Sequence, residues 1–198
     1  MLKRTSFIVT AHASATACLV GCMVLLLAAT ASAGSGYEVT HPPHTVAAPE
    51  DAQLFYLEFR ARDEADGFGH SYVTLGAIDA SNHAHQTLVA GFVPRSADDD
   101  YWSKFGLPVT GLIGVTRSDL FRQPDARFRI LINKATYLRA IATIRKLEHT
   151  WTGYELILHN CNSFVGEVAR SVGLQAPLIT AQYPVHYVAE LGTLNSHR

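Results

Sequence analysis

Segments with strand-like composition come first along the chain and segments with helical spacing follow. This order restricts the possible folds more than any other feature. Strand-like composition comes first, in "QLFYLEFRAR" (53–62), "HSYVTLGA" (70–77), "HQTLVAGFV" (85–93), "LIGVT" (112–116) and "RFRILIN" (127–133). Helical spacing follows, in residues 134–151 and 160–173. Strands followed by helices predict an α+β fold, with an antiparallel sheet packed against a few helices.

Three connections carry more specific expectations. Residues 70–77 and 85–93 predict an antiparallel hairpin around the turn "IDASNHA". Residues 94–108, "PRSADDDYWSKFGLP", predict a surface loop. Pro184 predicts the start of a short last helix.

Each of the two main helices is expected to bury one apolar stripe. Asn133 can cap the first helix, and Asn160 and Gly173 mark the two ends of the second. The first stripe consists of Leu138, Ile141, Ile144 and Leu147. The second consists of Phe164, Val165, Val168, Ala169 and Val172. Both stripes predict packing against the sheet.

Residues 1–33 have the pattern of a secretory signal peptide. Lys3 and Arg4 precede the apolar run "ACLVGCMVLLLAA", and Ala31-Ser32-Ala33 forms a small-x-small cleavage site. The apolar run is shorter than the roughly 20 residues of a membrane span, so no stable membrane insertion is expected after cleavage. "LVGC" at Cys22 resembles a lipoprotein box, which leaves a lipid anchor as the alternative. Either interpretation predicts an exported protein, periplasmic or secreted.

The remaining chain predicts an extended lead-in over 34–51 and a single domain over 52–198. The signal carries two basic and no acidic residues, so its removal shifts the net charge from −1 to −3. This net charge lacks the basic excess that is typical of nucleic-acid-binding domains. No cofactor is expected, and the pair His83 and His85 lacks further ligands at zinc-like spacing.

Cys161 is the chain's third cysteine, and the other two lie within the predicted signal. A lone thiol in an exported protein is a link between chains, an inert buried residue or a reactive group. Asn160 as N-cap places Cys161 in the first helical turn, where the helix dipole favours the thiolate. The amides of that turn can also bind the oxyanion formed when a carbonyl is attacked.

A thiolate nucleophile needs a base, and His70 is the strongest candidate. It follows "GFG" and opens a predicted strand, so its ring is expected at the end of the sheet beside a glycine-rich loop. A third polar group usually orients such a base. His85 and Gln86 lie on the neighbouring strand with alternating orientation, and His85 is the preferred candidate.

"YELILHNCNSFVGEVARSVGL" (154–174) and "GHSYVTLG" (69–76) resemble the cysteine and histidine segments of permuted papain-like thiol enzymes. These include PPPDE peptidases, the lecithin:retinol acyltransferase family and bacterial cell-wall amidases of the NlpC type. In these families the histidine precedes the cysteine, as His70 precedes Cys161. The resemblance implies Cys161 as nucleophile, His70 as base, His85 as a second histidine and Tyr154 as a site-lining residue.

The resemblance implies a cysteine peptidase or amidase that forms a thioester with a protein amide or a peptidoglycan peptide. The first alternative is lipid acyl transfer or hydrolysis by the same thiol. The second is a non-catalytic binding domain on the same fold, which predicts that Cys161 and His70 are separated or blocked. The distance between these two side chains separates the readings.

Overall fold

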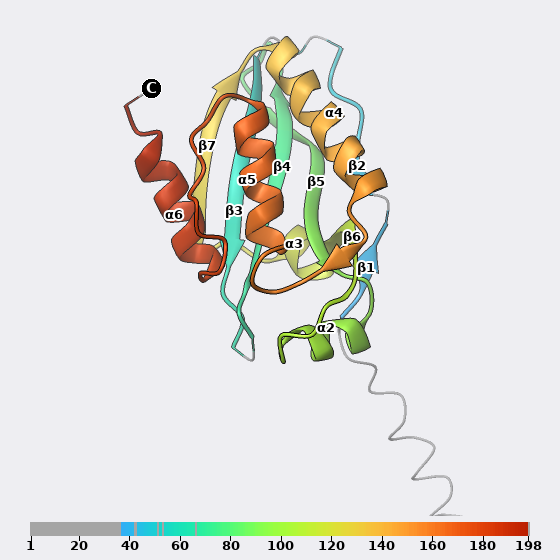
Figure 1. Ribbon diagram of the computed structural model, residues 1–198. Helices are drawn as coiled ribbons and strands as arrows, with labels where there is room; N and C mark the ends of the chain where they lie inside the picture. The colour runs from blue at the N-terminus through green and yellow to red at the C-terminus, as the bar shows by residue number, and fades with distance from the viewer. Residues whose placement is uncertain (1–36, 42, 51, 53, 66, 198) are drawn as a thin grey trace, which may run out of the picture. The chain divides into compact units, whose positions relative to one another are not determined.

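The computed structural model describes residues 37–197 except 42, 51, 53 and 66, so the predicted signal lies outside the described residues. The described chain from Tyr37 onward forms one compact unit. It combines an open antiparallel sheet with helices (Figure 1), which confirms the predicted α+β class. Among these residues, no helix combines the length and apolar character that a bilayer span requires.

The sheet is built around two long hairpins. Its strands are β3 (Leu54–Arg62), β4 (His70–Ile78), β5 (Ala84–Pro94), β6 (Val109–Thr116) and β7 (Ala126–Ile132). They are ordered β6-β5-β4-β3-β7, and every pair is antiparallel. The predicted hairpin of the second and third strands is therefore confirmed, and β3 lies between β4 and β7.

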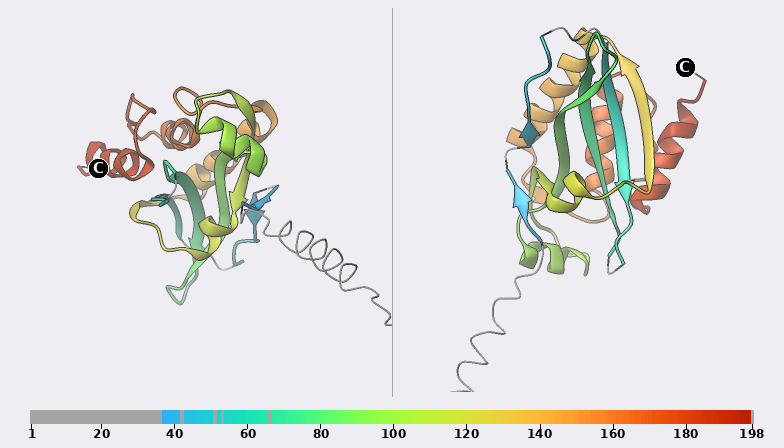
Figure 2. Two further views of the ribbon diagram at one scale, coloured as in Figure 1. Left: turned by 90° about the horizontal axis from the view of Figure 1, so that it is seen from below. Right: turned by 180° about the vertical axis from the view of Figure 1, so that it is seen from behind.

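Three helices cover one face of the sheet: α4 (Lys134–Thr150), α5 (Cys161–Ser171) and α6 (Pro184–Leu194) (Figures 1 and 2). The core lies between this face and the helices. Strand alternation supplies Leu57, Phe59, Val73 and Leu75 from the sheet, and Ile144, Phe164, Val168 and Leu191 face them from the helices. The start of α6 at Pro184 agrees with the prediction.

The apolar stripe of α5 is confirmed, whereas that of α4 is rotated from the prediction. Phe164, Val165, Val168 and Ala169 are fully buried in the core. On α4, Tyr137 and Ala140 are buried, and Leu138 is 52% exposed. The prediction counted only aliphatic residues, and Tyr137 buries its ring against Phe55 with centroids 4.5 Å apart.

The lead-in is extended and pairs with the sheet. Two short strands, β1 (Val39–Thr40) and β2 (His44–Thr45), pair with β6 and β5. His41 Nδ1 lies 2.9 Å from the Ile113 carbonyl oxygen. The segment therefore completes one side of the sheet. A further short strand, β8 (Gly153–Tyr154), also pairs with β6.

Two short helices replace what the sequence predicts as irregular chain. The predicted loop 94–108 contains α2 (Ala97–Ser103), capped by Ser96 with three acidic residues in its first turn. The second, α3 (Arg117–Phe121), directly follows β6 and begins with a capping box between Thr116 and Asp119. Both helices are too short to show helical hydrophobic spacing, so their capping residues are the main local signal for them.

Candidate functional site

Helix α5 begins at Cys161 and packs over the start of β4, the strand that begins at His70. The Asn160 side chain accepts a 3.0 Å hydrogen bond from the Ser163 N–H, and Ser163 Oγ accepts one from the Asn160 N–H at 3.2 Å. The first N–H groups of a helix have no partner within it, and they form the positive end of its dipole. Cys161 therefore occupies the position that the sequence predicts for it.

A hydrogen-bonded clamp joins this helix start to the strand. Ser71 Oγ donates to Asn162 Oδ1 at 2.8 Å. The Asn162 amide nitrogen donates to the carbonyl oxygens of Thr180 at 3.0 Å and Gln182 at 2.8 Å. Because Ser71 and Asn162 each follow a site residue in the chain, this clamp holds His70 next to Cys161.

The Cys161 thiol and the His70 imidazole form a coupled pair. Burial raises the pKa of Cys161, but hydrogen bonding and the charge of His70, with hydrogen bonds from Ser71, bring this pKa below its ordinary value. Burial lowers the pKa of His70, but the charge of Asp119 and the interactions with Cys161 bring it above its ordinary value. Both directions favour a thiolate beside an imidazolium.

Asp119, on α3, is the third charged group of the site. His70 Nε2 lies 3.7 Å from Asp119 Oδ2, and the Asp119 side chain is fully buried. The same Oδ2 accepts a 2.8 Å bond from the Thr116 N–H, and Oδ1 accepts a 3.1 Å bond from Arg62 Nε. Arg62 is the strand partner of His70. The carboxylate is therefore fixed in place, facing the imidazole.

The His70 ring fits in a space that a glycine leaves open. A Cβ atom on Gly91 would lie 2.5 Å from His70 Nε2. The ring also lies nearly parallel to the Tyr72 ring, with centroids 5.9 Å apart and an interplanar angle of 8°. These neighbours restrict the imidazole to the position between Asp119 and Cys161.

Tyr154, on β8, lines the same pocket as Cys161. Burial, followed by the negative charge of Cys161, raises the pKa of Tyr154 well above its ordinary value. The phenol therefore stays protonated and can donate a hydrogen bond next to the reacting atom. Tyr154 is a site-lining residue, as expected.

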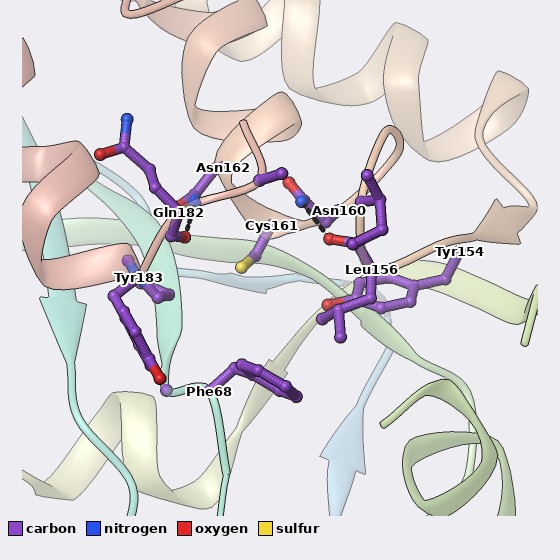
Figure 3. Close-up of a pocket in the computed structure, with 12 residues that line it drawn as sticks. Phe68, Tyr154, Leu156, Asn160, Cys161, Asn162, Gln182 and Tyr183 are labelled. Carbon is purple, nitrogen blue, oxygen red and sulfur yellow. Dashed lines mark hydrogen bonds between the residues drawn. The ribbon is translucent and has the colours of Figure 1, made fainter. Parts of the chain in front are cut away.

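The sulfur lines a pocket of about 230 Å³ (Figure 3). Figure 3 shows Cys161 between Tyr183 and Phe68 on one side and Tyr154 and Leu156 on the other. Cys161 itself is 5% exposed. The thiol is thus buried but borders an open pocket, which provides a path for a substrate.

Comparison with models of protein families, with curated proteins and with solved structures found no match. The site must therefore be interpreted from its own geometry. Over residues 37–197, apart from the positions left undescribed, no three His, Cys, Asp or Glu side chains gather as metal ligands would.

The structure does not bring His85 or Gln86 to this site, and their assignment to it is corrected here. His85 pairs with Ala77 and Gln86 with Gly76, near the far end of β4 from His70. Seven residues of strand at about 3.3 Å each separate His85 from His70 by roughly 23 Å. In a hairpin with a short turn, the start of the second strand pairs with the end of the first. His85 instead bonds Asp79 Oδ2 at 2.7 Å.

Asp119 was not predicted, although the sequence holds a signal for it. Thr116-Arg117-Ser118-Asp119 has the spacing of a capping box and comes directly after a strand. That signal predicts a helix start but not the location of its carboxylate. The location depends on the pairing of β5 with β4 and β6, which brings the end of β6 beside the start of β4.

Proposed function

We propose that the protein is a cysteine hydrolase of the permuted papain-like kind, acting on an amide bond. The observation that carries the proposal is geometric: a 2.8 Å hydrogen bond joins Ser71 to Asn162, the residues that follow His70 and Cys161, and Asp119 Oδ2 lies 3.7 Å from His70 Nε2. The strand that begins with His70 precedes the helix that begins with Cys161 in the chain. This order supports the proposed likeness to permuted papain-like enzymes.

In the first half of the reaction, the Cys161 thiolate attacks the carbonyl carbon. A C–S bond forms, and the carbonyl π electrons move to the oxygen. The Cys161 backbone N–H and the Tyr154 hydroxyl are the donors available for that oxyanion. When the intermediate collapses, the C–N bond breaks, the His70 imidazolium gives its proton to the leaving nitrogen, and a thioester remains.

In the second half, water replaces the amine. Neutral His70 takes a proton from the water as its oxygen attacks the thioester carbon. Collapse breaks the C–S bond, releases the carboxylic acid and restores the thiolate beside the imidazolium. Asp119 stabilises the imidazolium in both halves, because its fixed carboxylate faces the ring.

The pair predicts a thiol that reacts well below the ordinary thiol pKa of about 8.5. The full chain is treated with iodoacetamide between about pH 5 and 9, and adducts are assigned to Cys161 by peptide mass mapping. Wild type is expected to reach its full rate below about pH 8. His70→Ala is expected to move the reaction to alkaline pH, because the thiol loses its positive partner.

His149→Ala is the matched control, since His149 is exposed in the last turn of α4 and lies outside the site. Its alkylation profile should follow wild type. An unchanged profile in His70→Ala, with the fold intact by circular dichroism, contradicts the proposal. It would favour a non-catalytic binding domain instead.

A further inference from the structure

The pocket beside Cys161 is lined mainly by hydrocarbon from three separate segments. Phe68 comes from the loop between β3 and β4, and Tyr183 and Pro184 come from the start of α6. Leu156 and Ile157 precede α5. The remaining lining residues are Gly69, Tyr154, Asn160, Cys161, Asn162, Ala181 and Gln182. None of these carries a formal charge except the proposed thiolate.

The polar amides at this pocket already have partners. Asn160 Nδ2 donates to the Leu156 carbonyl oxygen at 2.6 Å and Asn162 Nδ2 to that of Gln182 at 2.8 Å (Figure 3). Gln182 Nε2 donates to the Ile179 carbonyl oxygen at 2.9 Å and to Glu190 Oε2 at 3.0 Å. A polar group that enters the pocket would lose water and find few replacement donors.

The two buried charges behind His70, those of Asp119 and Arg62, are also unavailable to a ligand. Asp119 is fully buried behind His70, and Arg62 is 2% exposed and bound to Asp119 and Glu64. A charged substrate group in the pocket would therefore have no counterion from the lining, and burying an unpaired charge is strongly unfavourable.

Large apolar side chains are also exposed around the pocket. Phe68 is 43% exposed, Ile157 48% and Tyr183 55%. Clustered exposed apolar groups are typical of surfaces that bind another molecule. The pocket and its rim thus present the same kind of surface to whatever approaches Cys161.

We infer that the substrate places an uncharged, apolar group in this pocket, next to the reacting carbonyl. The inference rests on the proposed function and deepens it by naming the substrate class. A volume of about 230 Å³ is below the roughly 300–1,000 Å³ of whole-ligand sites, which suits one side chain or a short alkyl chain. The shared chemistry is an apolar aliphatic or aromatic group, supplied by a peptide residue or by an acyl chain.

The test compares alkylation rates of Cys161 in the full chain at neutral pH. Iodoacetamide measures the reactivity of the thiolate alone. The pocket's preference for apolar or charged groups is measured with N-benzyl iodoacetamide, N-hexyl iodoacetamide and iodoacetate. The apolar derivatives should react about tenfold faster than iodoacetamide, because they bury apolar surface. Iodoacetate should react more slowly than iodoacetamide. A benzyl rate above the hexyl rate favours a peptide side chain, and the reverse order favours an acyl chain.

Two neighbouring residues provide variant and control. Ile157→Lys places a positive charge in the lining, so it should reduce the apolar preference severalfold and raise the relative rate of iodoacetate. Ile157→Glu should lower the iodoacetate rate further. Leu158→Lys adds the same charge at an exposed residue outside the lining, and its rate ratios should stay close to wild type.

The outcomes separate this inference from the proposed function. Fast iodoacetamide reaction with no gain for the apolar derivatives overturns the inference and leaves the thiolate pair in place. Equal effects of Ile157→Lys and Leu158→Lys also overturn it. Slow reaction of iodoacetamide at neutral pH removes the proposed function, and the inference with it.

Discussion

At the scale of single residues, charges of alternating sign run through the site. Arg62 is positive, Asp119 negative, His70 positive when protonated and Cys161 negative when ionised. Each group is nearly excluded from water, so each charge depends on its neighbours for stabilisation. Removal of one member therefore changes the protonation of the others. Arg62 stays charged, whereas the Cys161 thiolate loses its charge when its sulfur bonds to a substrate carbonyl.

Asp119→Asn is expected to move alkylation of Cys161 to higher pH. Asp119 raises the pKa of His70, so without it the imidazolium loses its proton at lower pH. The pKa of Cys161 then rises, and alkylation at neutral pH should slow by about tenfold. Asp125→Asn is the control, because Asp125 is exposed and its carboxylate accepts a bond from the Asp63 N–H, away from His70. If both variants keep the wild-type alkylation profile, Asp119 does not act on His70.

Residue types and spacing predict Cys161 and His70 but not Asp119, and Tyr154 is predicted by the family resemblance alone. Cys161 and His70 stand in segments whose local pattern already indicates their position: a capped helix start and the first residue of a strand. Asp119 reaches the site through strand order, which is not visible in local pattern. His85 failed for a related reason, because hairpin pairing puts it at the opposite end of β4 from His70.

At the scale of elements, the site depends on how the start of α5 is fixed to β4. The dipole of α5 favours the thiolate only while Cys161 stays beside His70. The link between Ser71 and Asn162 holds these two starts together, and its atoms are buried. The sequence predicts both elements, but the hydrogen bond between them depends on which face of α5 meets the sheet.

Ser71→Ala is expected to cost about 1 kcal/mol of unfolding free energy and to raise the pKa of Cys161, because the hydrogen bond to Asn162 that holds Cys161 beside His70 is lost. Urea unfolding and the iodoacetamide profile measure the two effects. Thr87→Val removes a similarly buried hydroxyl, bonded to Tyr137 on α4 at 2.8 Å. It should lose similar stability and keep the wild-type profile. A Ser71→Ala profile identical to that of Thr87→Val would show that Ser71 supports only the fold.

At the scale of the whole described unit, the two faces of the sheet differ in chemistry. One face is hydrocarbon under α4, α5 and α6, and Figure 2 shows the sheet from the opposite side. On that opposite face Glu58 is 1% exposed, and its carboxylate accepts hydrogen bonds from Arg60 Nε and Arg129 Nε. The Arg129 guanidinium also lies 4.4 Å from the Tyr56 ring centroid. Ion pairs and long side chains therefore cover this part of the face opposite α4, α5 and α6.

This difference predicts that stability and reactivity can be changed separately. Glu58→Gln removes the charge between Arg60 and Arg129, and breaking a buried pair is strongly destabilising. Water screens the guanidinium groups, which are 18% and 43% exposed, so we expect a loss of about 2 kcal/mol in urea unfolding. Glu167→Gln, in an exposed pair with Arg170, should change stability by less than about 0.5 kcal/mol.

The folded Glu58→Gln protein should keep the wild-type alkylation profile, because Glu58 contacts neither His70 nor Cys161. A shifted profile in the folded variant would mean that the charges of this face reach the thiol through the sheet.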